Sequence, residues 1–219
     1  LYVPFINLID QWQMIIVFIS IASMLFGAIA AIGQKKLKRL IAYSSIGHMG
    51  YALAGLSVGT NGGIQSSIIY ISIYLVMNLA FFCGLFMLRK NEQYYENIED
   101  LSGLSKNHPI LSVSFLIILF SLAGIPPLAG FFAKFYIFMA VIEKSMYFLA
   151  IVGLLSTVVA AYYYLKIIKI IYFDSEKENY DTDHHVGLKV SLMLSVIFIL
   201  FYFIYPNGLI EIISKINII

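Results

Sequence analysis

The sequence predicts an all-α integral membrane protein of about six transmembrane helices, one of which is broken near its middle. Of the 219 residues, 61% are hydrophobic and only 12% are charged, and the mean hydropathy is +0.89. Soluble domains carry about twice that charged fraction. The chain has too few polar side chains to cover a core of this size in water. We therefore expect residues 1–219 to form a single membrane domain whose solvent is lipid.

Apolar runs give the positions of the expected spans. A helix needs about 20 apolar residues to cross a bilayer. Six runs meet this length: 14–33, 40–58, 64–88, 110–142, 146–173 and 186–205. The polar stretch at about 174–185 is predicted to be a solvated loop. The tail, 206–219, is too short to cross again once Pro206 turns the chain, so we expect it at the membrane surface.

The basic residues predict the orientation. Of the 14 Lys and Arg residues, eleven fall in loops or helix ends on one side of the predicted membrane. Lys144 and Lys215 fall on the other side, and Lys134 stands inside a helix. By the positive-inside rule the eleven face the cytoplasm, so both ends of this chain are expected on the outer side. The chain begins with Leu1 rather than Met, and we expect it to be a fragment of a longer protein.

Several chemistries have no basis in this sequence. Cys83 is the single cysteine and lies in an apolar run, which excludes an intramolecular disulfide and a cysteine metal cluster. His184 and His185 have no Cys or carboxylate at metal-ligand spacing, so no metal site is predicted. Motifs for phosphate-binding loops, nucleophile elbows and catalytic carboxylate pairs are absent. A net charge of +2, with no interleaved basic groove, gives no reason to expect nucleic acid as a partner.

The run 110–142 is too long for one straight span. As a helix it would measure roughly 50 Å, against about 30 Å of hydrocarbon. Near its middle stands the sequence Gly124-Ile125-Pro126-Pro127-Leu128-Ala129-Gly130. The prolines have no N–H, so the carbonyls of Leu122 and Ala123 lose their helical partners. Such carbonyls are tolerated inside protein or beside a water-filled cavity, which predicts either a broken-helix ion site or an ordinary proline kink packed by neighbours.

Lys134 follows the break by seven residues and is flanked by aromatic side chains. A lysine near the centre of a membrane helix costs about 3 kcal/mol on insertion scales, which favours a functional role. The alternative is a lysine that snorkels towards the nearer interface. Glu143 marks that interface about nine residues away, so the Lys134 stem covers only part of the distance. We interpret Lys134 as the principal candidate for proton transfer.

Two neighbouring runs each carry polar side chains on one helical face. In the run 40–58, one helical face carries three polar side chains at positions i, i+4 and i+7, namely Ser44, His48 and Tyr51. The His48 imidazole is expected near the middle of the bilayer. Because His titrates near neutral pH, both a proton relay and a neutral His bonded across a helix interface fit this position. In the run 64–88, a stripe of polar side chains on one face consists of Ser67, Tyr70, Tyr74 and Asn78. Such a stripe either lines a hydrated path or joins neighbouring helices by hydrogen bonds. Lys38 opens the second span and is first interpreted as a topology determinant.

Three stretches resemble the antiporter-like subunits of respiratory complex I. Residues 33–51, GQKKLKRLIAYSSIGHMGY, resemble the loop and start of the tenth helix of that family. Residues 121–138, SLAGIPPLAGFFAKFYIF, resemble the broken twelfth helix with its central lysine. Residues 161–173, AYYYLKIIKIIYF, are similar to the end of the thirteenth helix in subunit N. Together with the span count, the resemblance covers essentially the whole chain and implies most of the second inverted repeat of an antiporter-like subunit.

Within the family the pattern is most similar to subunit N. Subunit M has a similar pattern but carries Glu at the position of Lys134. Subunit L continues into further helices after this region. The resemblance implies that Lys134 serves the half-channel on the outer side and that Lys38 and His48 lie on the connecting polar path. The family's other essential groups, a Glu and two Lys of the N-terminal repeat, would precede Leu1. Their absence here predicts that this chain does not pump independently.

The resemblance implies a proton-translocating membrane subunit of NADH:quinone oxidoreductase, a translocase of the respiratory chain in the cell inner membrane. Its expected partners are the other membrane subunits, the lipid bilayer and protons as the transported ion. NADH, flavin, iron–sulfur clusters and quinone (ubiquinone) would be bound elsewhere in the complex, and no cofactor is expected on this chain. The first alternative is a subunit of a multi-subunit sodium/proton antiporter. The second is a truncated scaffold that conducts nothing.

Overall fold

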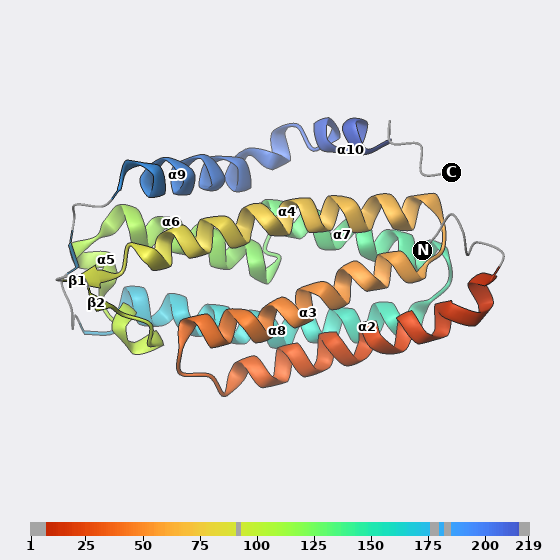
Figure 1. Ribbon diagram of the computed structural model, residues 1–219, viewed down its shortest axis with the longest axis horizontal. Helices are drawn as coiled ribbons and strands as arrows, with labels where there is room; N and C mark the ends of the chain where they lie inside the picture. The colour runs from red at the N-terminus through yellow and green to blue at the C-terminus, as the bar shows by residue number, and fades with distance from the viewer. Residues whose placement is uncertain (1–7, 91–92, 176–179, 182–184, 215–219) are drawn as a thin grey trace.

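The computed structural model describes residues 8–90, 93–175, 180–181 and 185–214 as an elongated bundle of helices. The long elements run side by side along one axis (Figure 1). They are α2 (Ile9–Ile32), α3 (Leu37–Ser57), α4 (Asn61–Phe86), α6 (Pro109–Ala123), α7 (Ala129–Glu143), α8 (Tyr147–Phe173) and α9 (Val186–Phe201). Five of the six predicted runs each correspond to one of these helices. The sixth, the long run 110–142, contains both α6 and α7. The predicted all-α membrane fold is confirmed.

Four of the described helical segments are long and apolar enough to cross a membrane: Gln11–Ile32, Asn61–Phe86, Tyr147–Phe173 and Val186–Ile204. The other two predicted spans take different forms. α3 is 21 residues long but carries polar side chains on buried faces, and more than half of its residues are buried. α6 and α7 are 15 residues each, so neither is long enough alone. Each of these two spans therefore depends on its neighbours to cover polar groups.

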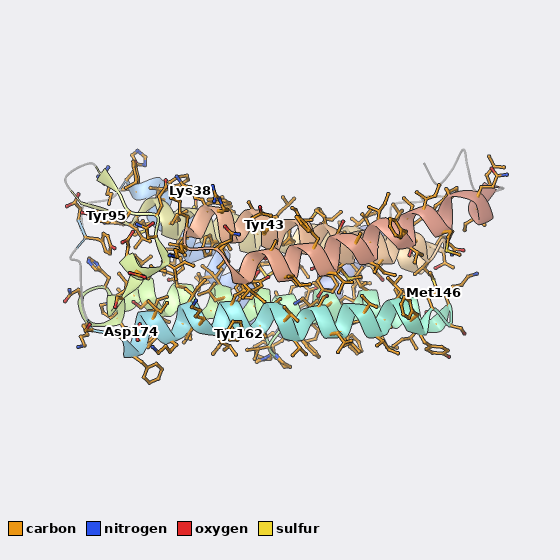
Figure 2. All side chains as sticks on the ribbon, turned by 90° about the horizontal axis from the view of Figure 1, so that it is seen from below. Lys38, Tyr43, Tyr95, Met146, Tyr162 and Asp174 are labelled. Atoms are coloured by element: carbon orange, nitrogen blue, oxygen red, sulfur yellow. The ribbon has the colours of Figure 1, made fainter. Side chains whose placement is uncertain are left out.

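Short elements gather at one end of the bundle. They comprise the antiparallel strands β1 (Arg89–Lys90) and β2 (Gln93–Tyr94), the 3-10 helix η2 (Ile98–Leu101) and α5 (Leu104–Asn107). Lys38, Tyr95 and Asp174 lie at this end and Met146 near the other (Figure 2). The loops predicted to share one side of the membrane thus lie at one end of the structure. The α3–α4 and α7–α8 connections lie at the opposite end, where α2 begins.

The predicted solvated loop at 174–185 is not solvated throughout. Tyr180 is buried, and its hydroxyl donates to the Asp100 carbonyl at 2.6 Å. Its backbone N–H donates to His108 Nε2 at 3.2 Å, and its ring packs against Tyr95 and His108. Burial lowers the pKa of His108, which keeps Nε2 free to accept this bond at neutral pH. The loop was predicted to be solvated because most of its residues are polar, but the contacts of Tyr180 hold this part of the loop against the bundle.

The tail continues in the direction of α9, although a turn at Pro206 was expected. The 3-10 helix η3 (Tyr202–Ile204) ends α9, and α10 (Asn207–Ser214) follows. Pro206 does not turn the chain away, because α10 continues along α4 beyond the end of α9 (Figure 1). Leu209 and Ile210 pack against the core and Ile213 is buried. The described part of the tail therefore follows the path of α9, and its expected place at the membrane surface stays a prediction.

α2 and α3 approach closely through glycines. A Cβ at Gly27 would lie 2.4 Å from Gly47 N and 2.7 Å from Tyr43 O, so only a hydrogen fits there. One turn further along, Ser20 Oγ donates to the Gly50 carbonyl at 2.7 Å. Small residues at membrane helix interfaces allow such backbone contact. This packing fixes the position of α3, which carries the polar side chains described below.

We expect Gly27→Ala to destabilise the bundle by about 1–3 kcal/mol, because the added methyl group overlaps the α3 backbone. The matched control is Gly33→Ala, where a Cβ would meet no atom within 4 Å. Thermal unfolding of the two variants in detergent, read by circular dichroism, measures the difference. A Gly27→Ala midpoint equal to that of Gly33→Ala would show that the contact is looser than described.

Candidate functional site

The break between α6 and α7 is the centre of the site. α6 ends at Ala123, and Gly124 adopts a left-handed conformation with φ of +88°. The Gly124 N–H turns back to the carbonyls of Phe120 and Ser121, while the Pro126-Pro127 peptide bond, which is cis, provides no donor. α7 then starts at Ala129. The predicted helix break is confirmed, and it leaves the next two carbonyls, of Leu122 and Ala123, without backbone partners.

Gly130 lets the two half-helices overlap. A Cβ there would lie 1.9 Å from the Ser121 carbonyl oxygen, so α7 begins directly against the last turn of α6. The Gly130 N–H donates to Ser121 Oγ at 2.9 Å. Both groups are buried. The first turn of α7 is therefore held beside the C-terminus of α6, and this places residue 134 level with the open carbonyls.

Lys134 closes the break. Its Nζ donates to the Leu122 carbonyl at 3.0 Å and to the Ala123 carbonyl at 3.1 Å. The negative end of the α6 dipole lies at the same place and favours a cation there. Nζ also lies 5.3 Å from the ring centroid of Tyr51, close enough for a cation–π contact. The side chain is 5% exposed. Lys134 does not snorkel to an interface; its ammonium group serves as the missing donor of the broken helix.

A small cavity adjoins Lys134. About 10 Å³ of it is open to the centre of a water molecule, which is close to the space that one water needs. Four helices contribute to its wall: α2, α3, α7 and α8. The polar groups on that wall are Ser44, His48, Tyr51, Lys134, Ser156 and Tyr163. The structure thus joins the lysine of the break and the polar face of α3 around one water-sized space.

His48 is held on both sides by tyrosines. Nδ1 lies 2.7 Å from the Tyr70 hydroxyl on α4, and Nε2 lies 3.1 Å from the Tyr164 hydroxyl on α8. The ring stacks on Tyr74 with centroids 4.6 Å apart. Tyr164 also hydrogen-bonds Ser44 Oγ, one turn before His48 on α3. His48 is therefore bonded across helix interfaces and lines the cavity, and its part in a proton relay stays a prediction.

Tyr51 lies close to both Lys134 and His48. Its hydroxyl is fixed to α8, at 2.7 Å from Ser156 Oγ and 2.8 Å from Thr157 Oγ1. Both of these side chains donate to the Gly153 carbonyl, so they orient the phenol. With its hydroxyl fixed to α8, the Tyr51 ring presents its face to Nζ. Tyr51 is thus a positioning residue for the lysine.

The α8 partners were missed by the sequence analysis. Ser156, Thr157, Tyr163 and Tyr164 occur within an apolar run, and the triplet Tyr162-Tyr163-Tyr164 spreads hydroxyls over more than half of the helix circumference. Ser156 and Tyr163 are seven residues apart and share a face, which is the one available signal. Nothing in that spacing indicates that this face meets His48, because the contact depends on where α8 packs.

The predicted stripe on α4 divides between two roles. Ser67 Oγ donates to the Ala52 carbonyl at 2.8 Å, and the Tyr74 hydroxyl donates to Ser45 Oγ at 2.6 Å. Both bonds join α4 to α3, as expected of a stripe that holds helices together. Tyr70 instead reaches His48. Asn78 Oδ1 is buried without a hydrogen-bond partner among the described residues.

Lys38 lies apart from this cluster. It stands at the first turn of α3, at the basic end of the bundle, and its side chain is 45% exposed. It forms an ion pair with Glu96 and contacts the Phe86 ring. The hydrogen bond from Lys38 lowers the pKa of the Glu96 carboxyl. The structure does not bring Lys38 to Lys134 and His48, and its role in a proton path stays a prediction.

A family model for the transmembrane region of NADH:quinone oxidoreductase and Mrp antiporter proteins matches residues 1–160. The chain belongs to this antiporter-like family. It is 77% identical over 219 residues to the NADH-quinone oxidoreductase subunit N of Pelagibacter ubique, covering all of this chain and 46% of the relative. It is 51% identical over 210 residues to the subunit N of Parvibaculum lavamentivorans, covering 96% and 44%.

Solved structures of the antiporter-like family agree with the fold. A chain of respiratory complex I from Thermus thermophilus superposes with a TM-score of 0.74 at 27% identity, over 89% of this chain and 44% of that one. A chain of the Mrp complex from Dietzia gives 0.81 at 22% identity, over 94% and 46%, and shows the fold alone. This chain spans about half the length of the curated relatives it matches. The resemblance drawn from the three sequence stretches is confirmed, and the protein is a multi-pass membrane protein.

We expect Gly124→Ala to disturb Lys134 without removing it. The position needs φ of +88°, which costs an L-residue about 1–2 kcal/mol, and the methyl group would lie 3.1 Å from Lys134 Cδ and 3.2 Å from Nζ. The thermal unfolding midpoint in detergent should fall, while the control Gly62→Ala, whose methyl group meets nothing closer than 4.0 Å, should match wild type. Equal midpoints for the two variants, read by circular dichroism, would show that the break tolerates a displaced lysine.

Proposed function

We propose that this chain is the C-terminal half of the proton-translocating subunit N of NADH:quinone oxidoreductase. The observation that carries the proposal is the Lys134 ammonium group, bonded to the two open carbonyls of a broken membrane helix beside a water-sized cavity. The relatives named subunit N support the assignment to this complex. Oxidation of NADH and reduction of quinone would occur on other subunits, and this chain would bind none of their cofactors.

The environment of Lys134 suits a group that gains and loses a proton. An ammonium has three N–H donors, of which two are used on Leu122 and Ala123. An amine keeps two N–H donors, so both bonds can persist after the third proton leaves. That proton would pass to water in the adjoining cavity, leaving a lone pair on Nζ to accept the next one. The transfer therefore requires no unpairing of the helix break.

The same site gives less support to a sodium path. Hard cations such as sodium prefer oxygen ligands, with carboxylates as the usual charged ones. None of the described residues that line the cavity is a carboxylate, and Lys134 contributes a positive charge. The likeness to an Mrp chain at 22% identity concerns the fold. We therefore prefer protons to sodium as the transported ion.

The proposed setting is the cell inner membrane, with the basic end of the bundle in the cytoplasm. The partners would be the other membrane subunits of the complex and the surrounding lipid. Large apolar side chains exposed along α2, α8 and α9 are compatible with both kinds of contact, for example Phe18, Val158 and Met193.

Cysteine labelling tests this orientation. In a Cys83→Ser background, Lys36→Cys should react with an impermeant thiol reagent from the cytoplasmic side only, and Asn61→Cys from the outer side only. The eleven-to-two distribution of basic residues is the reason. Labelling of both positions from one side would contradict the orientation.

Lys134 variants test the function in the assembled complex. In Lys134→Ala, the two unpaired carbonyls cost about 1–3 kcal/mol each, and removal of a buried lysine returns about 3 kcal/mol, so assembly should survive. Proton pumping should be lost, together with the coupled NADH:quinone turnover. Lys134→Arg should also fail, since an arginine keeps its charge and hardly releases a proton.

The matched control is Lys144→Ala, an exposed lysine just beyond the end of the same helix. Turnover and membrane potential are measured together in inverted vesicles, after native gels have established the amount of complex. If Lys134→Ala assembles and pumps like Lys144→Ala, then Lys134 has a structural role and the proposed function is wrong.

A further inference from the structure

A second cavity, of about 950 Å³, lies at the basic end of the bundle, apart from the site around Lys134. Its volume is within the range of cavities that hold small-molecule ligands. The loop between α2 and α3 forms one part of its wall, and η2 with its flanking residues forms another. The last two turns of α8, with the two residues that follow, complete the wall. Three separate stretches of the chain therefore meet around this space.

The acidic side chains on this wall already have partners. Asp174 Oδ1 accepts a hydrogen bond from Lys169 Nζ at 2.6 Å and forms an ion pair with it. Asp100 Oδ2 accepts from the Asn97 backbone N–H at 2.7 Å, and Glu99 has an interaction of its own. Each carboxylate that lines the cavity is thus engaged within the protein.

Two lysines on the same wall are not engaged. Lys35 and Lys166 are both exposed, and neither forms an ion pair within the part of the chain that the structure describes. The side chain of Asn97 accepts from the Asp100 backbone N–H, which leaves its own NH₂ group available to donate. Two ammonium groups and one amide donor therefore line one cavity, and this set suits a phosphate group.

The position of Lys166 along α8 places the cavity at the membrane boundary. Roughly 29 Å of helix separate Tyr147, the first residue of α8, from Lys166. The hydrocarbon core is about 30 Å thick, so with the start of α8 at one boundary Lys166 lies at the other. Lys35 follows shortly after Ile32, the last residue of α2. Both lysines are therefore expected at the depth of the lipid phosphates.

One face of α8 leads from the membrane interior to this cavity. Tyr162 and Asp174 mark this part of α8 in Figure 2. Phe173, which is 81% exposed, adds an apolar rim to the cavity. A soluble anion gains nothing from an apolar face, whereas acyl chains are stabilised by contact with one. The exposed side chains of this face recur at helical spacing, and the lysines follow the apolar ones: Val158, Tyr162, Leu165, Lys166, Lys169 and Phe173.

We propose that this cavity binds the headgroup of an anionic phospholipid, with the phosphate on Lys35 and Lys166 and the acyl chains along the exposed face of α8. Basic pockets between membrane helices bind anionic headgroups in this way. The Asn97 amide donates to a headgroup oxygen. A zwitterionic lipid brings an ammonium group of its own, so the two free lysines favour the anionic lipid over it. The proposal goes beyond the proposed function and does not depend on proton transport.

Photo-crosslinking in vesicles tests which lipid occupies the cavity. The full-length protein in its native assembly is reconstituted with a trace of phosphatidylglycerol that carries a diazirine in one acyl chain. After irradiation, mass spectrometry measures the fraction of the segment 158–173 that is linked to lipid. We expect at least about fivefold more labelling than with the same probe built on phosphatidylcholine, because one basic residue near an anionic surface contributes about that factor. Equal labelling by the two probes overturns the proposal.

Substitution of the two free lysines tests the site itself. Both positions are exposed, so a Lys35→Gln, Lys166→Gln double variant should fold, and its labelling by phosphatidylglycerol should fall to the phosphatidylcholine level. The double variant with Arg at both positions keeps the charges and should label like wild type. Lys106→Gln is the matched control, since it removes an exposed lysine of the same end that does not line the cavity. Equal labelling of the Gln double variant and Lys106→Gln overturns the site.

Two further results would identify a different occupant. Excess inorganic phosphate, compared with chloride at the same ionic strength, should leave the labelling unchanged. If phosphate abolishes it, the site binds a free anion and the lipid assignment is wrong. If neither probe labels 158–173, protein covers this face and the assignment is equally wrong. All labelling is measured without NADH, so a failure of the proposed proton transport would not alter these results.

Discussion

The two hydrogen bonds from Lys134 to the carbonyls of Leu122 and Ala123 are the interaction on which the centre of this structure depends. A membrane interior provides no water for an unpaired carbonyl, so a broken helix needs donors from elsewhere in the protein. A buried ammonium likewise needs acceptors. The break and the lysine satisfy one another, and each would be unfavourable alone. Removing the lysine therefore changes both the charge and the hydrogen bonding of α6.

α3 connects this pair to the rest of the bundle. Its glycine face lies against α2, where Gly27 and Gly47 allow the backbones to touch, and its polar face is directed to α4, α7 and α8. Close packing on one side holds the polar side chains in place on the other. His48 in consequence has partners on two different helices. Close packing at the α2 contact thus supports the hydrogen bonds that His48 makes with α4 and α8.

The two ends of the bundle contribute differently. The basic end is tied together by the Lys38–Glu96 ion pair, the pairing of the Arg89 and Gln93 strands, and the buried Tyr180. The opposite end has short connections, such as the turn through Ser145 between α7 and α8. The polar site lies between the ends, and apolar side chains such as Met24, Ala28 and Ala160 complete the wall of its cavity. This arrangement concentrates the charged side chains away from the cavity beside Lys134.

The sequence by itself determined the membrane class, the six runs, the break at Pro126-Pro127 and the isolation of Lys134, because composition, run length and missing N–H groups are local properties. It also identified the family, through three short stretches. The tertiary structure decided which donors fill the break, that Tyr70 and Tyr164 hold His48, and that Tyr180 is buried. It also separated Lys38 from the site. Those facts depend on which helix faces meet, and an almost uniformly apolar sequence carries little periodicity from which to predict them.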